Sequence, residues 1–205
     1  YKLDFARLAD RADLEELMGK VRSFLLYTGH AARINWDDTE GDFRYGTWFA
    51  REYGALYMAN RKPFVPPTTV YRPHTVLRDL WEASKYLNLL KVLGPIQNVD
   101  HVNPELSDAR LYGQDYAVAV TLFSLPTFFL EAKLYEEAAR AKIRPLLALH
   151  HEHREDIRRG ITYPIGSRPN GASWTGFQNH REEDDAGLLL LFRELANDDD
   201  TQDIA

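Results

Sequence analysis

The sequence contains no cysteine, which excludes disulfide bonds, thiolate metal sites and thiol nucleophiles together. No apolar run approaches the ~20 residues that cross a bilayer, so we expect no membrane partner. The 25 lysines and arginines are also outnumbered by 31 aspartates and glutamates. The net charge of -6 and the isoelectric point near 5.7 leave no positive surplus to attract phosphates, which argues against nucleic acid. The compartment stays open, because many exported proteins also lack cysteine.

The composition is otherwise that of a folded domain, with 205 residues, 44% of them hydrophobic and 27% charged. No Gly-rich phosphate loop, G-x-S-x-G elbow or H-E-x-x-H motif is present. The sequence begins at Tyr1 rather than methionine and stops at Ala205 just after a charged turn. We therefore expect a section of a longer chain, with any signal peptide upstream.

Helices and strands alternate over the first 160 residues. Helical spacing of apolar side chains predicts three helices, over residues 13–27, 75–89 and 134–159, the last broken near Pro145. Short apolar runs predict strands over residues 31–36, 53–60, 91–98 and 116–123, although the last run could also be helical. This order predicts an α/β layer.

Beyond Gly160 the apolar period changes from 3.6 toward 2. Strands are expected over residues 161–165, 174–178 and 188–192, with an acidic hairpin tip at 182–185. Consecutive strands after an α/β layer predict a second, antiparallel β domain. The expected domains are therefore residues 1–160 and residues 161–205.

An acidic cluster follows the first predicted strand. In α/β barrels the active site lies at the carboxyl ends of the strands, which makes Asp37 the leading catalytic candidate. Hydrolysis of a glycosidic bond needs two carboxyl groups, and only one is convincing here. The alternative is that Asp37, Asp38 and Glu40 form a solvated loop or cap the next element.

Aromatic residues surround this cluster. Trp36 and Trp48, with Tyr45 and Tyr53, could stack on the apolar face of a sugar ring, or they could simply fill the core. Asn60 and Arg61 follow the next strand and could hold sugar hydroxyls.

Three histidines close together in the sequence could bind a metal ion. His150 and His153 would share a helical face, with His151 and Glu152 between them. The neighbouring residues 154–159 are mostly charged, which favours a solvated end of a helix instead. We therefore expect no metal site.

Several strings in the sequence carry a family resemblance. They are Asn35–Glu40 (NWDDTE), Arg51–Arg61 (REYGALYMANR), Tyr71–Tyr86 (YRPHTVLRDLWEASKY), Ile161–Gln178 (ITYPIGSRPNGASWTGFQ) and Leu188–Glu194 (LLLLFRE). Their order resembles the C-terminal part of melibiase-type α-galactosidases and related bacterial glycoside hydrolases, over nearly the whole chain from Asn35 onward.

The resemblance implies a fold and a reaction. The fold would be the C-terminal part of a (β/α)8 barrel, followed by the start of an antiparallel β-sandwich. The reaction would be retaining hydrolysis of α-galactosides or related α-linked sugars by two aspartates, without metal or organic cofactor. Asp37 matches a D-x-T position of the family, and Asn98 matches a further position in the sugar site.

Two departures from the family pattern keep a second function open. The family has an acid where this chain has Ala59, and another where it has Gln97. Loss of these acids would suit a catalytically inactive carbohydrate-binding or scaffold module.

A complete barrel takes about 250 residues, so residues 1–160 hold only part of one. We expect the second carboxylate upstream of Tyr1 and the isolated chain to be inactive. An open barrel edge would also favour a homo-oligomer or association with the missing parent segment.

Overall fold

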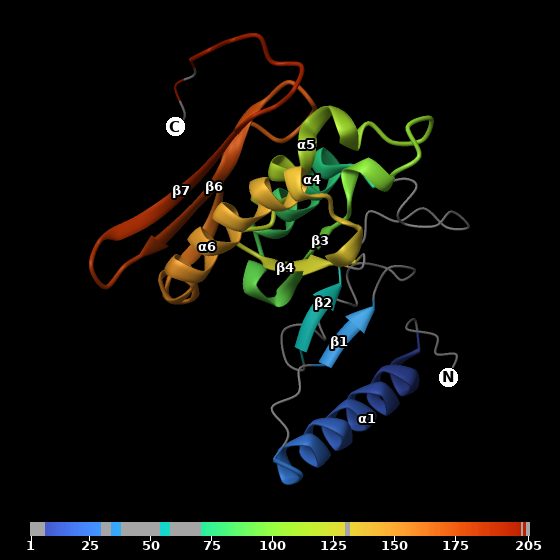
Figure 1. The fold of residues 1–205 in the computed structure, drawn as a ribbon. Coiled ribbons are helices and arrows are strands. Elements are labelled where there is room, and N and C mark those ends of the chain that lie inside the picture. The colour runs from blue at the N-terminus through green and yellow to red at the C-terminus, as the bar shows by residue number, and fades with distance from the viewer. Residues whose placement is uncertain are drawn as a thin grey trace. The chain divides into compact units, whose positions relative to one another are not determined.

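A computed structural model describes residues 7–29, 34–37, 54–57, 71–129, 132–201 and 203 of the chain (Figure 1). For residues 34–37 and 54–57 it describes the backbone alone. The described residues mix helices and strands, which confirms the α/β class, and they form no barrel. The chain divides into two compact units, residues 1–57 and residues 58–205.

The first unit contains helix α1 (Leu8–Tyr27) and strands β1 (Ile34–Asp37) and β2 (Gly54–Tyr57). The predicted helix is confirmed, and it begins five residues before the expected Asp13. Gly29 follows its end with φ of 70°, a conformation that glycine adopts without steric cost. The two strands are parallel, with Ile34 opposite Gly54 and Asp37 opposite Tyr57.

The first part of the second unit alternates helices and strands. Its elements are α4 (Pro73–Ala83), η1 (Leu89–Lys91), β3 (Val92–Ile96), η2 (Val99–His101), α5 (Ala109–Ala119), β4 (Leu125–Phe128), η3 (Ala132–Leu134) and α6 (Glu137–Arg159). Strands β3 and β4 are parallel, with Ile96 opposite Phe128. Both strands therefore end at the same edge.

One hydrophobic cluster joins these elements. Its buried members are Ile96, Val118, Leu122, Tyr135, Ala139 and Ile143. They come from β3, from α5 and the turn after it, from Tyr135 just before α6, and from one side of α6. Burial of these side chains is what holds the two helices against the strand.

The strand predicted over residues 116–123 is wrong, because α5 runs to Ala119 and a turn follows it. Ala117, Val118 and Val120 are all buried. A short helix end that is buried on all sides produces an uninterrupted apolar run, and periodicity cannot distinguish such a run from a buried strand.

Two helix ends also differ from expectation. Helix α6 continues through Pro145 without the predicted break, although Pro145 has no N–H to donate to the carbonyl of Ala141. Helix α4 ends at Ala83 rather than near Leu89. There the Ser84 hydroxyl donates to the Trp81 carbonyl at 2.8 Å.

The second part of this unit is an antiparallel sheet of β5 (Ile161–Gly166), β6 (Trp174–Arg181) and β7 (Ala186–Arg193), in that order. The predicted strands and hairpin tip are confirmed. The inner face of the sheet covers α5 and the turn after it. Phe177 contacts Phe123 and Phe192 contacts Tyr116, with ring centroids 6.5 and 5.5 Å apart.

Polar side chains join the helices to this sheet across Gly160. The amide of Asn179, fully buried on β6, donates to the Ile157 carbonyl at 3.1 Å and to the Thr162 hydroxyl at 3.0 Å. The Trp81 indole N–H donates to the Ile165 carbonyl at 3.2 Å. Residues on both sides of Gly160 thus belong to one compact unit, and the domain boundary predicted there stays a prediction.

Truncating a side chain on the inner face of the β5–β6–β7 sheet should lower the free energy of unfolding far more than truncating one on the outer face. Phe177→Ala removes a buried ring and is expected to lower the free energy of unfolding by about 3–5 kcal/mol. The matched control is Gln178→Ala, the next residue along β6, whose side chain is exposed on the other face. Its effect should stay within about 0.5 kcal/mol. Urea unfolding of both variants measures the difference, and equal losses would contradict the packing described above.

Candidate functional site

Asp37 is the last residue of β1, and Tyr57, directly opposite it, is the last residue of β2. Parallel strands that end in register present their carboxyl ends at one edge, where barrel enzymes place catalytic groups. The backbone thus places Asp37 at the carboxyl end of a strand, with Trp36 one residue before it. The predicted site residues Trp48, Asn60 and Arg61 lie outside the described residues.

Asn98 lies two residues beyond the end of β3 and is only 1% exposed. Its side-chain oxygen accepts from the Asp100 N–H at 3.0 Å, and its amide nitrogen donates to the Leu134 carbonyl at 3.1 Å. Both ends of the side chain are therefore engaged by the protein. Through these two hydrogen bonds Asn98 connects the loop after β3 to the segment after β4. It therefore helps to determine the backbone conformation at the carboxyl ends of these two strands.

Two glutamines complete the connection behind this loop. The Gln114 side chain accepts from the Val99 N–H at 3.0 Å and donates to the Gln97 carbonyl at 3.1 Å. The side-chain oxygen of Gln97 is buried and has no hydrogen-bond partner among the described residues. A buried polar atom without a partner costs free energy, and it commonly marks a place where water or a ligand binds.

Tyr135 lies just after η3 and is almost fully buried. Its ring meets the edge of Phe128, the last residue of β4, with centroids 5.9 Å apart. Burial raises the pKa of its hydroxyl to about 12. That hydroxyl also has no hydrogen-bond partner within the described part of the chain.

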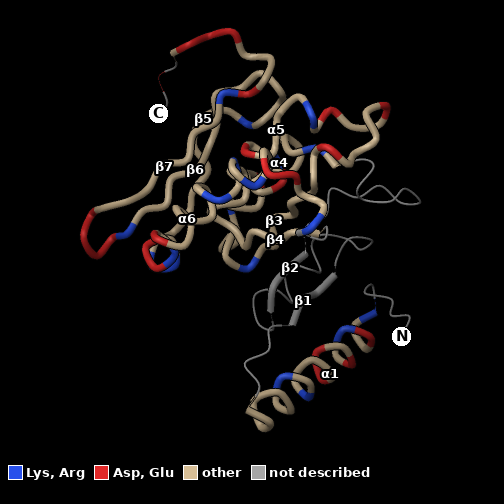
Figure 2. The backbone as a smooth tube through the Cα atoms, in the orientation of Figure 1, with Lys and Arg blue, Asp and Glu red and all other residues tan. Residues whose placement is uncertain are grey.

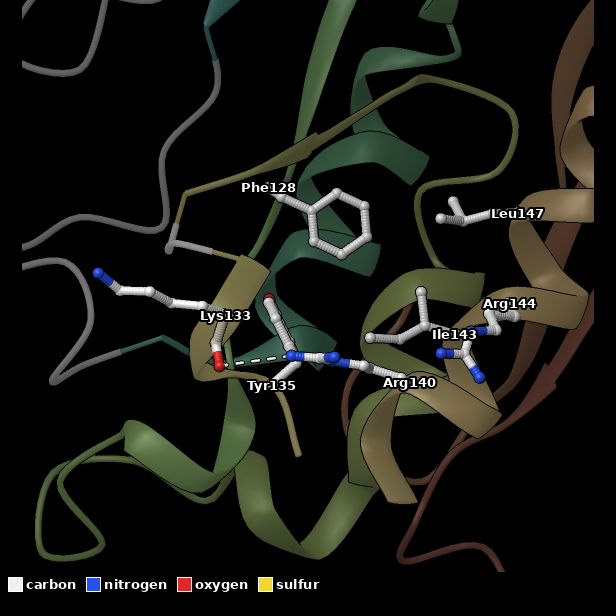
Figure 3. A pocket seen from close by; sticks show the side chains of 7 residues that line it. All are labelled: Phe128, Lys133, Tyr135, Arg140, Ile143, Arg144 and Leu147. Carbon is white, nitrogen blue, oxygen red and sulfur yellow. Dashed lines mark hydrogen bonds between the residues drawn. The ribbon is translucent and has the colours of Figure 1, made fainter. Parts of the chain in front are cut away.

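Phe128 and Tyr135 line a pocket of about 560 Å³ beside the end of β4. The other lining residues are Lys133, Arg140, Ile143, Arg144 and Leu147, so that the loop before α6 and the first turns of α6 form most of its wall (Figure 3). Ile143 and Tyr135 belong to the hydrophobic cluster, which gives the pocket a packed apolar floor. Its volume is within the range of small-molecule sites.

The charged groups that line this pocket are cationic. Arg140 donates to the Lys133 carbonyl at 3.4 Å, and Arg144 pairs with Glu137 at 2.6 Å. None of the described lining residues carries a carboxylate or an imidazole. The pocket can hold an apolar group beside positive charge, but it has no acid and base for hydrolysis.

A buried carboxylate lies at the end of β7. Glu194 is 1% exposed, and one of its oxygens accepts from the backbone N–H groups of Asn170, Gly171 and Ser173, each at 2.9 Å. Three convergent donors hold the carboxylate and fix the loop between β5 and β6. Glu194 has no predicted role of its own in the sequence and is named there only as the last residue of the string Leu188–Glu194. In the structure it holds a loop in place.

Aromatic rings form a row near Glu194. His74 stacks on Tyr112 at 5.3 Å, and Tyr112 contacts Tyr116 at 4.9 Å. Burial, followed by the charge of Glu194, raises the pKa of Tyr116 above its usual range. Burial also lowers the pKa of His74, against the attraction of Asp108. The row joins α4, α5 and β7.

Two of the three histidines of α6 contact protein groups. His150 Nδ1 lies 2.9 Å from the Leu122 carbonyl, and His153 Nδ1 lies 3.4 Å from the Asp156 carboxylate. Among the described residues no three His, Cys, Asp or Glu side chains form a group that could bind a metal ion.

Comparison of the chain with models of protein families, with curated proteins and with solved structures found no match. In the part of the chain that the structure describes, no helix is both long and apolar enough to span a membrane.

The buried tyrosines predict a loss of stability at high pH. A tyrosine whose pKa is raised in the folded state stabilises the protein below pH 10, and this contribution is lost as the pH rises through the folded pKa. Tyr112 and Tyr135 reach about 12, so the free energy of unfolding should fall steeply between about pH 10 and 12. Tyr135→Phe should reduce the slope of the free energy of unfolding against pH in this range, because phenylalanine cannot ionise.

The exposed Tyr27 provides the control, and Tyr27→Phe should leave the slope unchanged. Urea unfolding at several pH values compares the three proteins. An unchanged slope in Tyr135→Phe would contradict the burial of this hydroxyl.

Glu194→Gln tests the buried carboxylate. The amide lacks the negative charge that strengthens three backbone hydrogen bonds, so we expect a loss of about 1.5–3 kcal/mol in the free energy of unfolding. Glu182→Gln, at the exposed hairpin tip, should change it by less than about 0.5 kcal/mol. Thermal unfolding of both variants gives the comparison, and a neutral Glu194→Gln would show that the carboxylate does not hold the loop.

Proposed function

We propose that this chain is the C-terminal section of a glycoside hydrolase of the melibiase type, which hydrolyses α-galactosides or related α-linked sugars with retention. The observation that carries the proposal is the position of Asp37. It is the last residue of a strand whose parallel neighbour ends directly opposite, at Tyr57. Catalytic side chains of barrel enzymes occupy such carboxyl ends.

The arrangement of the second unit supports the same proposal for the fold. Its order β3–α5–β4–α6, with β3 and β4 parallel, is the repeat from which a (β/α)8 barrel is built. The antiparallel strands β5–β7 then follow directly. On this proposal they open a β-sandwich domain at the end of the barrel.

The proposed chemistry needs two carboxyl groups. In a retaining hydrolase they lie about 5–5.5 Å apart, one as nucleophile and the other first as acid and then as base. Asp37 is one of them, and the second belongs to another strand of the barrel. Neither reaction role of Asp37 is favoured over the other by its place on β1.

Asn98 has a positioning role in this proposal. Because its side chain is engaged by Asp100 and Leu134, it holds the edge beyond β3 in shape instead of donating freely to a sugar. The unpartnered side-chain oxygen of Gln97 lies next to it in the sequence and can accept from a hydroxyl or from water.

A second candidate function is a carbohydrate-binding or scaffold module without turnover. Two observations favour it. None of the described residues that line the pocket carries a carboxylate, and Gln97, next to Asn98, stands where the family has an acid. Such a surface could bind a sugar without cleaving it.

Asp37→Asn tests the catalytic proposal in the longest natural polypeptide that contains this sequence. Nitrophenyl α- and β-glycosides serve as substrates. Removal of a catalytic carboxylate should lower kcat/KM for an α-galactoside by several orders of magnitude without unfolding the protein. Asp38→Asn, one residue along the same cluster, should keep activity within about tenfold of the wild type.

The two candidate functions give different results in this assay. Loss of activity in Asp37→Asn alone supports the hydrolase. No cleavage by the wild type, together with saturable binding of galactose or melibiose by calorimetry, would support the binding module. Equal activity of Asp37→Asn and the wild type would contradict the catalytic role of Asp37.

A further inference from the structure

The loop between β5 and β6 contains an asparagine followed by a glycine, Asn170 and Gly171. The backbone nitrogen of a glycine in this position can attack the side-chain carbonyl of the asparagine, because glycine has no Cβ to obstruct the approach. The attack closes a succinimide ring and releases ammonia. Asn-Gly is therefore the pair at which asparagine deamidates most readily, and it occurs at this one position of the sequence.

The shape of the loop requires this glycine. Gly171 has φ of 97°, a backbone conformation that a residue with a Cβ rarely adopts. Its carbonyl accepts from the Ala196 N–H at 2.9 Å, which connects the loop to the segment after β7. The residue that gives the loop its conformation is thus also the residue that makes Asn170 chemically unstable.

The side-chain carbonyl of Asn170 is well placed to be attacked. Asn170 is exposed, and its Oδ1 accepts from the Ala172 N–H at 2.9 Å. The Ser173 hydroxyl oxygen also lies 2.9 Å from this Oδ1. Ring closure develops negative charge on Oδ1, and hydrogen-bond donors at such an oxygen stabilise the transition state.

The attacking nitrogen is restrained by Glu194. The Gly171 N–H donates to Oε2 of this buried carboxylate at 2.9 Å. Attack requires the Gly171 nitrogen to lose its proton, and its negative charge would then lie beside the carboxylate. Like charges repel strongly at a buried site, so the contact makes this nitrogen a poor nucleophile. Arg168 is the only charged residue of the loop itself, and the restraining charge comes from the end of β7 (Figure 2).

We propose that Asn170 is a site of spontaneous deamidation that Glu194 keeps inactive in the folded chain. When the contact with the carboxylate opens, the Gly171 nitrogen attacks Cγ of Asn170. The new C–N bond closes the succinimide, the bond from Cγ to Nδ2 breaks, and ammonia leaves with the proton of the Gly171 nitrogen. Water then opens the ring at either carbonyl, which gives aspartate or isoaspartate.

The modification would weaken the loop permanently. Either product carries a carboxylate at position 170, whose backbone N–H donates to Glu194 at 2.9 Å. Two carboxylates then repel each other at the end of β7. Isoaspartate also lengthens the backbone by one methylene group, so the three N–H groups cannot converge on Glu194 as before. This inference is independent of the proposed hydrolase function.

Peptide mapping by mass spectrometry tests the proposal on the full 205-residue chain after incubation at mildly alkaline pH. The folded wild type should stay unmodified at Asn170, whereas the same chain in concentrated urea should deamidate there. Glu194→Gln keeps the shape of the side chain without its charge. It should deamidate at Asn170 about tenfold faster than the wild type, because the weaker contact opens more often. A mixture of aspartate and isoaspartate peptides identifies the succinimide route.

Asn88 is a matched control within the same chain. Its Oδ1 accepts from the Leu90 N–H at 2.9 Å, two residues on, as Asn170 Oδ1 does from Ala172, but Leu89 takes the place of the glycine. Asn88 should therefore stay unmodified in every sample.

Ile143→Ala is the matched control for stability. It removes a buried side chain of the hydrophobic cluster and lowers the free energy of unfolding without touching the loop between β5 and β6. While this variant is folded, Asn170 should deamidate in it no faster than in the wild type. The variant thus separates opening of the loop from unfolding of the whole chain.

The proposal is overturned if the folded wild type deamidates at Asn170 as fast as the chain in urea, or if the chain in urea does not deamidate there. It is also overturned if a folded Glu194→Gln variant and the wild type deamidate at equal rates. Circular dichroism checks that this variant is folded. If it is not, amide hydrogen exchange in the wild type decides: a Gly171 N–H that exchanges as fast as in the unfolded chain contradicts its restraint by Glu194.

Discussion

The inner face of the β5–β6–β7 sheet must be covered, and the rest of the second unit is arranged around that requirement. Three strands with one apolar face are stable only when that face packs against another layer. Phe177, Leu190 and Phe192 therefore lie against α5, α6 and the turn between α5 and β4. The same two helices also cover Ile96 of β3, so sheet and parallel strands share one core.

Polar groups fix the details that apolar packing leaves open. Asn179 ties β6 to the end of α6, and Glu194 holds the loop between β5 and β6 by three backbone donors. Asn98 does the same for the loops beyond β3 and β4. Because these connections are buried, the edge at the carboxyl ends of β3 and β4 has a defined shape, with unpartnered polar atoms at Gln97 and Tyr135.

The sequence predicted most elements but few of these connections. Regular periodicity located α1, α6 and the three strands after Gly160, and it placed Asp37 at the end of a strand. It failed over residues 116–123, where burial on all sides removes the periodic signal. The pocket could not be predicted, because it depends on bringing Phe128 of β4 together with side chains of α6. Glu194 stood out only within a family string, and its three backbone partners lie more than 20 residues away in the sequence.

Native-state hydrogen exchange on the complete chain tests most directly whether the sheet and the helices depend on each other. If they form one cooperative unit, the slowest amides of β6, α5 and α6 should exchange with the same opening free energy and respond equally to low concentrations of urea. This result would place no independent domain boundary at Gly160. A β5–β7 sheet that opens at a clearly lower free energy than α5 and α6, with a different urea dependence, would contradict the shared core.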